Sequence, residues 1–233
     1  MENSAQPAET MSATAWRRVW ARPHNGIAAR LCAFGNWVGR VVTFSMLKDV
    51  DLRGGTILDL GCGHAEVTMA LLQRHGGRAL TAVDFCTEAI ESVRRRRGSL
   101  PVTTIYADLL KLDLDQQFDL VYSSMVIEHF WGEARRRAIA QHARFARPGG
   151  YVFINAPGRS FFSRIFDASL NQPSGIREKH FTPGELRALL SEHRLEIVRF
   201  RSLLLGSVLF VLARKQVECG GRLEVTLDRT GAE

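Results

Sequence analysis

The chain has 233 residues, of which 45% are hydrophobic and 24% are charged. This balance excludes a wholly disordered chain, and the length suits one α/β domain with additions or two small domains. The net charge of +7 makes nucleic acid or an anionic surface worth considering as a partner. Part of the excess lies in two arginine runs, residues 94–97 and 135–137, which we interpret as solvated helix faces. We therefore expect no dedicated nucleic-acid site.

The cysteines give no sign of a metal site. They are scattered, and no CxxC or Cys/His spacing typical of a metal centre occurs among them. Scattered cysteines in a chain of this length indicate reduced thiols and a cytoplasmic protein. Residues 1–10 lack the basic and apolar regions of a signal peptide, and the most apolar stretch, 203–213, is too short to span a bilayer.

The N-terminal part of the chain divides into two segments. Residues 1–13 are rich in Ser, Ala, Glu and Pro, which predicts disorder. Residues 14–50 form a predicted N-terminal helical cap, because Leu31, Phe34 and Val38 recur at helical spacing. This cap could pack against the main domain, act as a substrate lid, or give peripheral membrane contact as a basic amphipathic surface.

Residues 51–215 show a regular alternation of short apolar segments and helical patterns. Strands are predicted at 56–60, 79–84, 102–106, 118–123, 151–156, 195–200 and 208–213, and helices at 66–74, 87–97, 133–145 and 183–192. This alternation predicts a parallel sheet with helices on both faces. The Arg-Pro-Gly-Gly sequence at 147–150 predicts a turn, and Thr182-Pro183 followed by Glu185 predicts a helix start. The tail, 216–233, could add an edge strand or remain loose.

A glycine loop, Gly61-Cys62-Gly63, follows the first predicted strand and precedes a helix. In an open parallel sheet, ligands bind beyond the carboxyl ends of the strands. Glycines there let the backbone approach a ligand, and the helix N-terminus offers free N–H groups. Taken alone, Gly-x-Gly is weak evidence, because a tight turn without a ligand has the same pattern.

Acidic residues at the ends of three predicted strands strengthen the case for a ligand. Asp84 ends the second strand, where a carboxylate can accept both hydroxyls of a ribose. Asp108 follows the third strand, where a carboxylate can accept hydrogen bonds from an adenine amino group. Asp59 precedes the glycines and could brace the loop or meet an ammonium group. Any one of them could be a helix cap or a loop acid, but together they indicate an adenosine cofactor.

Glu66 helps to decide between two candidate cofactors that contain adenosine, a dinucleotide and S-adenosylmethionine. A dinucleotide would place its pyrophosphate at the helix N-terminus, where a third glycine is expected and Glu66 stands. A carboxylate there would repel the pyrophosphate. S-adenosylmethionine (SAM) has no phosphate and carries a sulfonium and an ammonium, so acids around the pocket suit it. The sequence therefore predicts SAM as the cofactor.

Ordered motifs across residues 54–214 resemble those of class I SAM-dependent methyltransferases, in particular the small-molecule branch related to ubiquinone and menaquinone biosynthesis. The motifs are Asp-Leu-Gly-Cys-Gly at 59–63, Val-Asp at 83–84, Ala-Asp-Leu at 107–109, Phe-Asp-Leu-Val-Tyr at 118–122 and Ile-Glu-His at 127–129, then Arg-Pro-Gly-Gly at 147–150. The resemblance implies an α/β fold, a Rossmann-like seven-stranded, mostly parallel sheet with helices on both faces and the last strand antiparallel, after an N-terminal helical extension.

The resemblance also implies roles for individual residues. The Gly61-Cys62-Gly63 loop would line the methionine moiety, and Asp84 would hold the ribose. Phe85 would pack on the adenine, and Asp108 with Leu109 would read its edge. Ser123 or Ser124 would flank the methionine and the transferred methyl group. The family loop usually has a third glycine where this chain has Ala65, so we expect a slightly tighter loop that still binds SAM.

Residues after the fourth strand are candidates for the chemistry. Methyl transfer is an in-line displacement, in which a base helps only if the nucleophile must lose a proton. His129 could be that base, although we favour a structural role for His129 and Glu128, tying a loop to a helix. Ubiquinone-pathway enzymes have a metal-associated Glu-x-x-Glu-His group, and Met125 stands at the position of its first Glu. We therefore predict no metal site.

Residues 157–181 are the predicted acceptor-side insertion. Its aromatic and aliphatic residues, including Phe161, Phe162 and Phe166, have helix-like spacing. They could be the buried face of a helix or an apolar acceptor pocket with His180 at its mouth. His180 is therefore the second catalytic candidate.

The sequence as a whole predicts methyl transfer from SAM to a small, partly apolar molecule, at oxygen. RNA or protein methylation is an alternative, suggested by the arginine excess. Against it, Ser-Ser-Met-Val at 123–126 lacks the Asn/Asp-Pro-Pro-aromatic motif of many base amino-methylating enzymes. A non-catalytic SAM-binding partner protein is the other alternative.

Overall fold

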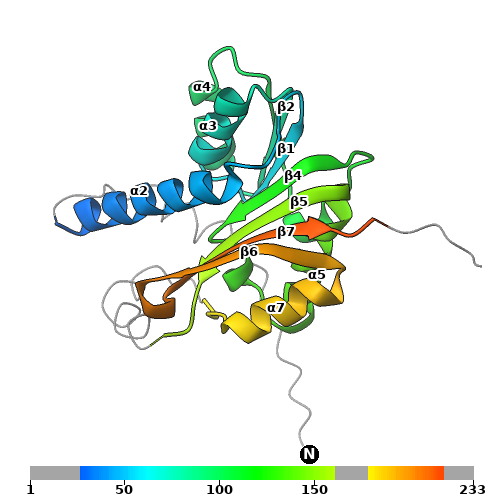
Figure 1. Ribbon diagram of the computed structural model, residues 1–233. Helices are drawn as coiled ribbons and strands as arrows, with labels where there is room; N and C mark the ends of the chain where they lie inside the picture. The colour runs from blue at the N-terminus through cyan, green and yellow to red at the C-terminus, as the bar shows by residue number, and fades with distance from the viewer. Residues whose placement is uncertain (1–26, 161–177, 218–233) are drawn as a thin grey trace, which may run out of the picture.

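Strands and helices alternate along the computed structural model, which describes residues 27–160 and 178–217 (Figure 1). The helices are α2 (Ile27–Leu47), α3 (Glu66–His75), α4 (Thr87–Arg96), α5 (Gly132–Phe145) and α7 (Pro183–Glu192), with short 3-10 helices η1 (Leu109–Lys111), η2 (Ile127–His129) and η3 (Leu204–Gly206). The strands are β1 (Thr56–Leu60), β2 (Ala79–Asp84), β3 (Val102–Tyr106), β4 (Phe118–Ser124), β5 (Ala146–Pro157), β6 (Leu195–Leu203) and β7 (Val208–Lys215). Each predicted strand and helix of the main domain is therefore present.

The strands form one seven-stranded sheet in the order β3-β2-β1-β4-β5-β7-β6. Neighbouring strands from β3 to β5 are parallel, whereas β7 runs antiparallel to both β5 and β6. The predicted fold class, including the antiparallel last strand, is confirmed. The carboxyl ends of β1, β2, β4 and β5 share one edge of the sheet, which we call the carboxyl edge, and ligands bind at this edge in open α/β sheets.

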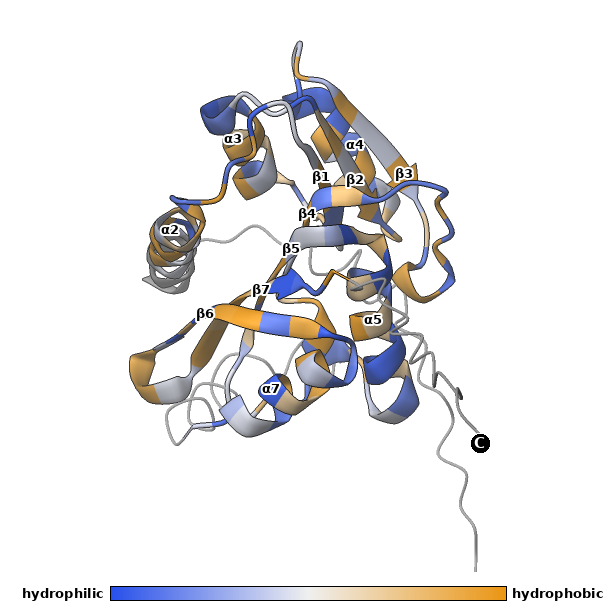
Figure 2. Ribbon diagram, turned by 45° about the vertical axis from the view of Figure 1, so that its right-hand side comes forward, coloured by the Kyte–Doolittle hydropathy of each residue, from blue (hydrophilic) through white to orange (hydrophobic). Residues whose placement is uncertain are grey.

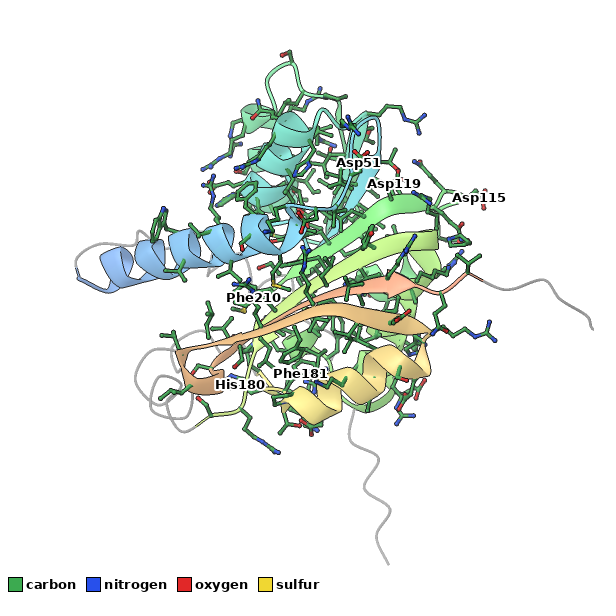
Figure 3. All side chains as sticks on the ribbon, viewed as in Figure 1. Asp51, Asp115, Asp119, His180, Phe181 and Phe210 are labelled. Carbon is green, nitrogen blue, oxygen red and sulfur yellow. The ribbon has the colours of Figure 1, made fainter. Side chains whose placement is uncertain are left out.

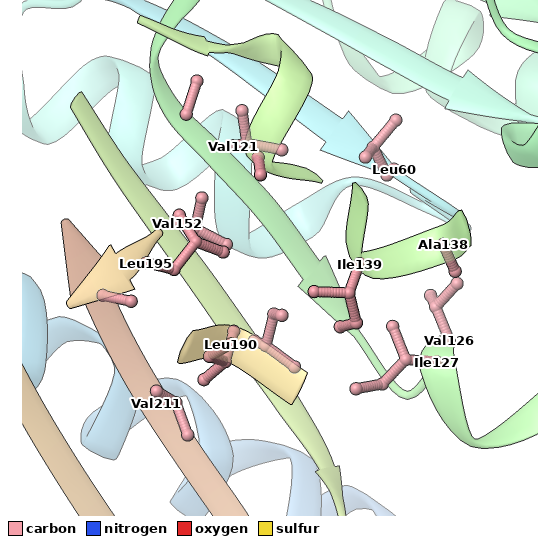
Figure 4. Close-up of a cluster of buried hydrophobic side chains, with 14 of the residues drawn as sticks. Leu60, Val121, Val126, Ile127, Ala138, Ile139, Val152, Leu190, Leu195 and Val211 are labelled. Carbon is pink, nitrogen blue, oxygen red and sulfur yellow. The ribbon is translucent and has the colours of Figure 1, made fainter. Parts of the chain in front are cut away.

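Alternating side chains on the strands build a core on each face of the sheet. On one face, Ile57 and Phe153 pack with residues of α2, α3 and α4. On the other face, Val121 and Val152 pack with Ile139 of α5 and with α7 (Figure 4). Burying each such side chain contributes about 1.5–3 kcal/mol, so both helical layers hold the sheet rigid beneath its carboxyl edge.

The C-terminal half of α2 is part of this core. Met46 and Leu47 have no exposed surface. The Arg199 side chain of β6 donates to the carbonyl of Met46 and forms an ion pair with Asp49. Packing is therefore established for this part of the predicted cap, while residues 14–26 lie outside the described residues.

One predicted turn is wrong. Residues 147–150 lie inside β5, which begins at Ala146, and the pairing of β4 with β5 shifts register between Phe118 and Leu120. The extra residues form an irregularity in which Gly149 takes a φ of 74°. Arg147 Nε donates to Asp119 Oδ1 across it at 2.6 Å. The glycines thus permit a bulged strand here, not a chain reversal.

One of the two arginine runs is only partly solvated. Arg136 and Arg137 are exposed, as are residues 94–97, but Arg135 is only 6% exposed. Helical spacing places Arg135 on the same side of α5 as the buried Ala138 and Ile139. The prediction of a solvated face was therefore wrong for Arg135.

Backbone carbonyls and an aromatic ring surround the buried guanidinium of Arg135. It donates to the carbonyls of Phe130 at 2.8 Å and Lys179 at 2.6 Å, and its carbon lies 4.0 Å from the centre of the Phe181 ring. These contacts join α5 to the strap 178–181, the segment that ends the acceptor-side insertion.

The predicted start of α7 is confirmed by its hydrogen bonds. The Thr182 hydroxyl accepts from the Glu185 N–H at 3.1 Å, and the Glu185 carboxylate accepts from the Thr182 N–H at 2.7 Å. This capping box fixes where the chain leaves the strap and enters the helix. In the part of the chain that the structure describes, no helix has the length and apolar character needed to cross a membrane.

Candidate cofactor and acceptor site

The glycine loop after β1 is held close to β2 and to the loop after β4. The N–H groups of Gly61 and Cys62 both donate to the carbonyl of Val83, at 2.9 and 3.0 Å. Gly61 has a φ of 71°, and a Cβ built on it would lie 2.6 Å from Val126 Cγ2. A side chain at position 61 would therefore strain the backbone and collide with Val126.

Asp84 lies at the end of β2, directly beside this loop. Its side chain accepts from the N–H groups of Gly63 at 3.0 Å and Cys86 at 2.8 Å, and the residue is 7% exposed. Burial raises the pKa of Asp84, and the N–H donors of Gly63, Cys86 and Phe85 oppose that rise. Each carboxylate oxygen keeps a further lone pair, so the group can also accept hydroxyl donors.

Asp59 is buried in the same region, on the face of the sheet covered by α3. Its Oδ2 accepts from the hydroxyl of Thr68 at 2.6 Å, and the residue is 2% exposed. Burial raises the pKa of Asp59 to about 7, the Thr68 hydrogen bond lowers it, and the charge of Asp84 raises it further. Asp59 therefore braces the start of α3, and its charge depends on what lies nearby.

The start of α3 shows what replaces the third glycine of the motif. Ala65 has φ 50° and ψ 25°, the left-handed conformation that glycine adopts without strain. Glu66 follows in the first turn and forms an ion pair with Arg96 of α4. Arg96 offsets part of the charge of Glu66. Glu66 would therefore repel a pyrophosphate less strongly than the sequence alone suggested.

The adenine-side candidates gather beyond β2 and β3. The N–H of Ala107 donates to the carbonyl of Asp84 at 3.0 Å, which brings the loop after β3 beside Asp84. Asp108 caps η1 by accepting from the Leu110 N–H at 2.9 Å, and Phe85 is half-buried. The side chain of Leu109 instead packs in the core beneath the sheet. Asp84, Phe85 and Asp108 thus share one rim.

The two serines at the end of β4 face opposite sides of the sheet. Ser123 is fully buried, and its hydroxyl lies 2.8 Å from Nε2 of His142 in α5. Ser124 is half-buried on the other face and pairs in register with Asn155 of β5. Ser124 is therefore the one of the two whose side chain lies on the Asp59 face.

Asn155 is a polar residue at this edge that sequence reasoning missed. It is 6% exposed, and its Oδ1 has no hydrogen-bond partner among the described residues. A buried amide oxygen without a partner is costly, which makes it a candidate for contact with a ligand. The available signal was one asparagine inside the otherwise apolar stretch 151–156.

Glu128 and His129 are buried in η2, just after β4. They are 1% and 3% exposed, and His129 Nε2 lies 3.7 Å from Glu128 Oε1. Burial raises the pKa of Glu128 well above its usual range. The carbonyl of Glu128 accepts from the Lys179 N–H at 3.0 Å, so η2 lies directly against the strap 178–181.

His180 lies in that strap, at the opposite end of the sheet from Asp119 (Figure 3). It is half-buried, and its Nε2 lies 3.5 Å from Glu178 Oε2. The N–H of Phe181 donates to the carbonyl of Pro157 at 3.0 Å, which ties the strap to the end of β5. The predicted pocket residues Phe161, Phe162 and Phe166 lie outside the described residues.

These contacts place both catalytic candidates on neighbouring segments at the carboxyl edge. His129 belongs to η2 and His180 to the strap that η2 contacts. Within residues 27–160 and 178–217, no group of three or more His, Cys, Asp or Glu side chains is arranged to hold a metal ion. The chemistry available here is that of imidazoles, carboxyls and one unpaired amide oxygen.

The cofactor rim suits a cationic adenosine compound. Asp59 and Asp84 are both buried carboxyls whose pKa values burial raises. Such groups gain stability from a nearby positive charge, which SAM carries on its sulfonium and its ammonium. Gly61 and Gly63 both have positive φ angles, 71° and 50°, so glycine is the residue that suits the backbone of this loop.

Comparison with known proteins agrees with this geometry. Residues 57–150 match the family model described as a methyltransferase domain. The chain is 27% identical over 128 residues to malonyl-[acyl-carrier protein] O-methyltransferase of Anoxybacillus flavithermus, a match that covers 55% of this chain and 49% of that protein. It is 27% identical over 185 residues to ubiquinone biosynthesis O-methyltransferase of Pseudomonas paraeruginosa, covering 69% of this chain and 78% of that protein.

A solved structure shows the same fold. Magnesium protoporphyrin IX methyltransferase from Synechocystis superposes with a TM-score of 0.71 and 17% identity, over 87% of this chain and 94% of that chain. Residues 57–150 are similar to a methyltransferase domain, and the sheet order and the glycine loop with its rim acids support a class I SAM-dependent methyltransferase. Its cofactor is SAM. The chain spans about half the length of the first curated relatives, 49% in the case of the A. flavithermus protein.

Proposed function

We propose that this chain transfers the methyl group of SAM to an oxygen atom of a small, partly apolar molecule. The observation that carries the proposal is the position of Asp84, a buried carboxylate fixed between Gly63 and Cys86 at the carboxyl edge. Such a group fits the ribose of SAM and would hold the methyl group near the ends of β4 and β5. The proposed oxygen target is supported by the names of the two curated relatives, both O-methyltransferases.

The acceptor would bind where η2 meets the strap 178–181. Positioning contributes most to a methyl displacement, and a rigid edge of the sheet provides it. If the acceptor hydroxyl must lose its proton, His129 and His180 are the candidate bases, each beside a glutamate. Asn155 is a candidate hydrogen-bond partner for a polar group of the acceptor or of the cofactor.

The proposal is tested by incubating the full chain with SAM labelled in its methyl group and an extract of cellular metabolites. We expect the label in a product that partitions into organic solvent. Heat-treated protein serves as the control. Label recovered in RNA or protein, with none in the organic phase, would contradict the proposal.

Methylation of RNA or protein has less support from the surface. Arginines of the run 94–97 make local contacts: Arg94 Nε donates to the Thr104 hydroxyl at 2.9 Å, Arg96 pairs with Glu66, and Arg97 Nη1 donates to the Val102 carbonyl at 2.9 Å. These contacts occupy a hydrogen-bond donor of each of the three guanidinium groups, although the side chains remain exposed. Affinity for RNA that falls steeply with salt would instead favour the nucleic-acid function.

A SAM-binding partner protein without catalytic activity is distinguished by the same experiment. Such a protein would bind SAM in calorimetry yet release no labelled product and no S-adenosylhomocysteine. We infer a cytoplasmic location, supported by the buried free thiols of Cys62 and Cys86.

A further inference from the structure

The tip of the β6–β7 hairpin exposes two leucines on a strained backbone. Leu204 is 71% exposed and Leu205 is 81% exposed. Their φ angles are 49° and 52°, in the left-handed region that disfavours residues with a Cβ. Neither side chain gains burial in return. A segment that is strained and also exposes large apolar groups points to a binding role.

The hairpin tip lies at the carboxyl edge, beside the end of β5. The N–H of Gly158 donates to the carbonyl of Ser207 at 2.8 Å, and the hydroxyls of Ser160 and Ser207 are 2.7 Å apart. A Cβ built on Gly158 would lie 1.9 Å from the carbonyl oxygen of Gly206. The tip is therefore held firmly against β5 while its two leucines point away from the core.

The two chain segments that meet at the tip carry basic residues and no acidic ones. Arg201 precedes the tip and is exposed, and the exposed Arg159 stands between two residues that contact Ser207. The sequence contains no Asp or Glu from residue 197 to 213 or from 154 to 160. Positive charge around an apolar tip is complementary to a negatively charged surface.

Helix α2 contributes further exposed apolar and basic residues. It projects to the same side of the molecule as the hairpin tip, and Figure 2 shows apolar residues on both (Figures 1 and 2). On α2, Trp37 is 59% exposed, Val41 is 48% exposed and Arg40 is exposed. Residues 27–47 contain no Asp or Glu. We call Leu204, Leu205, Trp37 and Val41, with their neighbouring arginines, the apolar-basic surface.

We propose that the apolar-basic surface binds an anionic phospholipid bilayer, with Leu204 and Leu205 entering the headgroup region and the arginines contacting lipid phosphates. Apolar side chains that enter the interface, together with attraction between basic residues and anionic lipids, are the two contributions that bind proteins peripherally to membranes. A second copy of this chain fits less well, because a symmetric contact would bring the arginines of the two copies together. The proposal concerns the hairpin tip and does not depend on methyl transfer.

The test is flotation of the full chain with vesicles of phosphatidylglycerol and phosphatidylcholine in equal parts, against vesicles of phosphatidylcholine alone. We expect flotation with the anionic vesicles, much less with the neutral ones, and a decrease as salt is added. The variant carries Leu204→Asn with Leu205→Gly, because both new residues tolerate a left-handed backbone. We expect it to melt at the same or a higher temperature and to bind the anionic vesicles at least about tenfold more weakly.

Val198→Asn is the matched control, since Val198 is 48% exposed and lies within β6, six residues before Leu204. We expect its vesicle binding to stay within about twofold of the wild type. Should the double variant fail to fold, Leu205→Asn alone gives the same comparison. SAM affinity, measured by calorimetry, should be unchanged in every variant, which separates this proposal from cofactor binding.

Two results would overturn the proposal. One is equal flotation of the wild type and the folded double variant. The other is a wild type that does not float with anionic vesicles at all. If that wild type is a dimer that the double variant converts to a monomer, the tip is a self-association surface instead.

Discussion

At the scale of single residues, Asp59 connects cofactor binding to pH. Burial raises its pKa to about 7, so near neutrality the carboxyl is partly protonated before a cation arrives. A bound SAM cation would favour the ionised form and lower this pKa, so binding should release up to one proton. Below pH of about 7, SAM affinity should therefore fall, by up to about tenfold per pH unit.

The measurement is calorimetry of SAM binding in two buffers with different heats of ionisation, repeated at several pH values. Asp59→Asn is the control, because an amide still accepts from Thr68 and does not titrate here. Proton release should disappear in this variant. Binding by the wild type with no proton release and no pH dependence would refute a charge interaction between Asp59 and SAM.

His142 predicts a second pH effect, on stability. Burial lowers its pKa to about 4, and its hydrogen bond to the Ala138 carbonyl opposes the shift only in part. The unfolded chain therefore binds this proton more readily than the folded chain between pH of about 4 and 6.5. The free energy of unfolding should fall as pH decreases through that window, by up to about 3 kcal/mol, and stay level above it.

Urea unfolding of the wild type and of His142→Gln across this window measures the effect. The variant lacks the imidazole, so the difference in unfolding free energy between the two proteins should shrink as pH falls. A difference that is independent of pH would show that His142 titrates normally in the folded state.

Among single residues, the sequence predicted the grouping of the glycine loop, Asp84 and Asp108 at one edge of the sheet, and it was less informative about the residues after β4 and β5. The glycine loop, Asp84 and Asp108 could be placed because strand ends in a parallel sheet share one edge. Ser123 and Ser124 could not be separated, because which face of β4 meets the site depends on tertiary packing. Asn155 was missed because it lies within an apolar sequence that is typical of a buried core strand.

At the scale of secondary-structure elements, Arg135 joins α5 to the strap 178–181. Its guanidinium donates to the buried carbonyl of Phe130 and the partly buried carbonyl of Lys179, and it covers the ring of Phe181. Arg135→Met would leave these carbonyls without donors, so we expect a loss of about 3 kcal/mol in the free energy of unfolding. Urea denaturation measures this loss.

The neighbouring arginine provides the matched control. Arg136 makes a 3.7 Å ion pair with Glu192 at the surface, so Arg136→Met should cost less than about 1 kcal/mol. Equal effects of the two substitutions would contradict the structural role of Arg135. Three consecutive arginines give no indication that one of them is buried. The difference arises because helical spacing places Arg135, and not Arg136, on the side of α5 that carries Ala138 and Ile139.

At the scale of the whole molecule, the alternation of apolar segments and helical patterns was enough to predict the sheet and its helical layers. It could not give the bulge in β5, because Gly149 and Gly150 suit a turn and a left-handed bulge equally well. The alternation also could not show which part of α2 packs in the core and which part is exposed. The structure places the end of α2 in the core and leaves Trp37 and Val41 exposed.

This division of α2 gives a stability prediction. Met46 has no exposed surface, and Met46→Ala should lower the free energy of unfolding by about 2–4 kcal/mol. Trp37 is 59% exposed, so Trp37→Ala should cost less than about 1 kcal/mol. Chemical denaturation of both variants compares them. Similar costs would mean that α2 packs differently along its length.

The central claim is that Asp84 holds the ribose of SAM at the carboxyl edge of the sheet. The most direct measurement is calorimetric titration of SAM into the wild type and into Asp84→Ala, with circular dichroism to check that the variant is folded. We predict that SAM binds the wild type at one site per chain, and that the variant binds at least about tenfold more weakly, because hydrogen bonds to a charged group are lost. Equal affinity of a folded variant would contradict the claim.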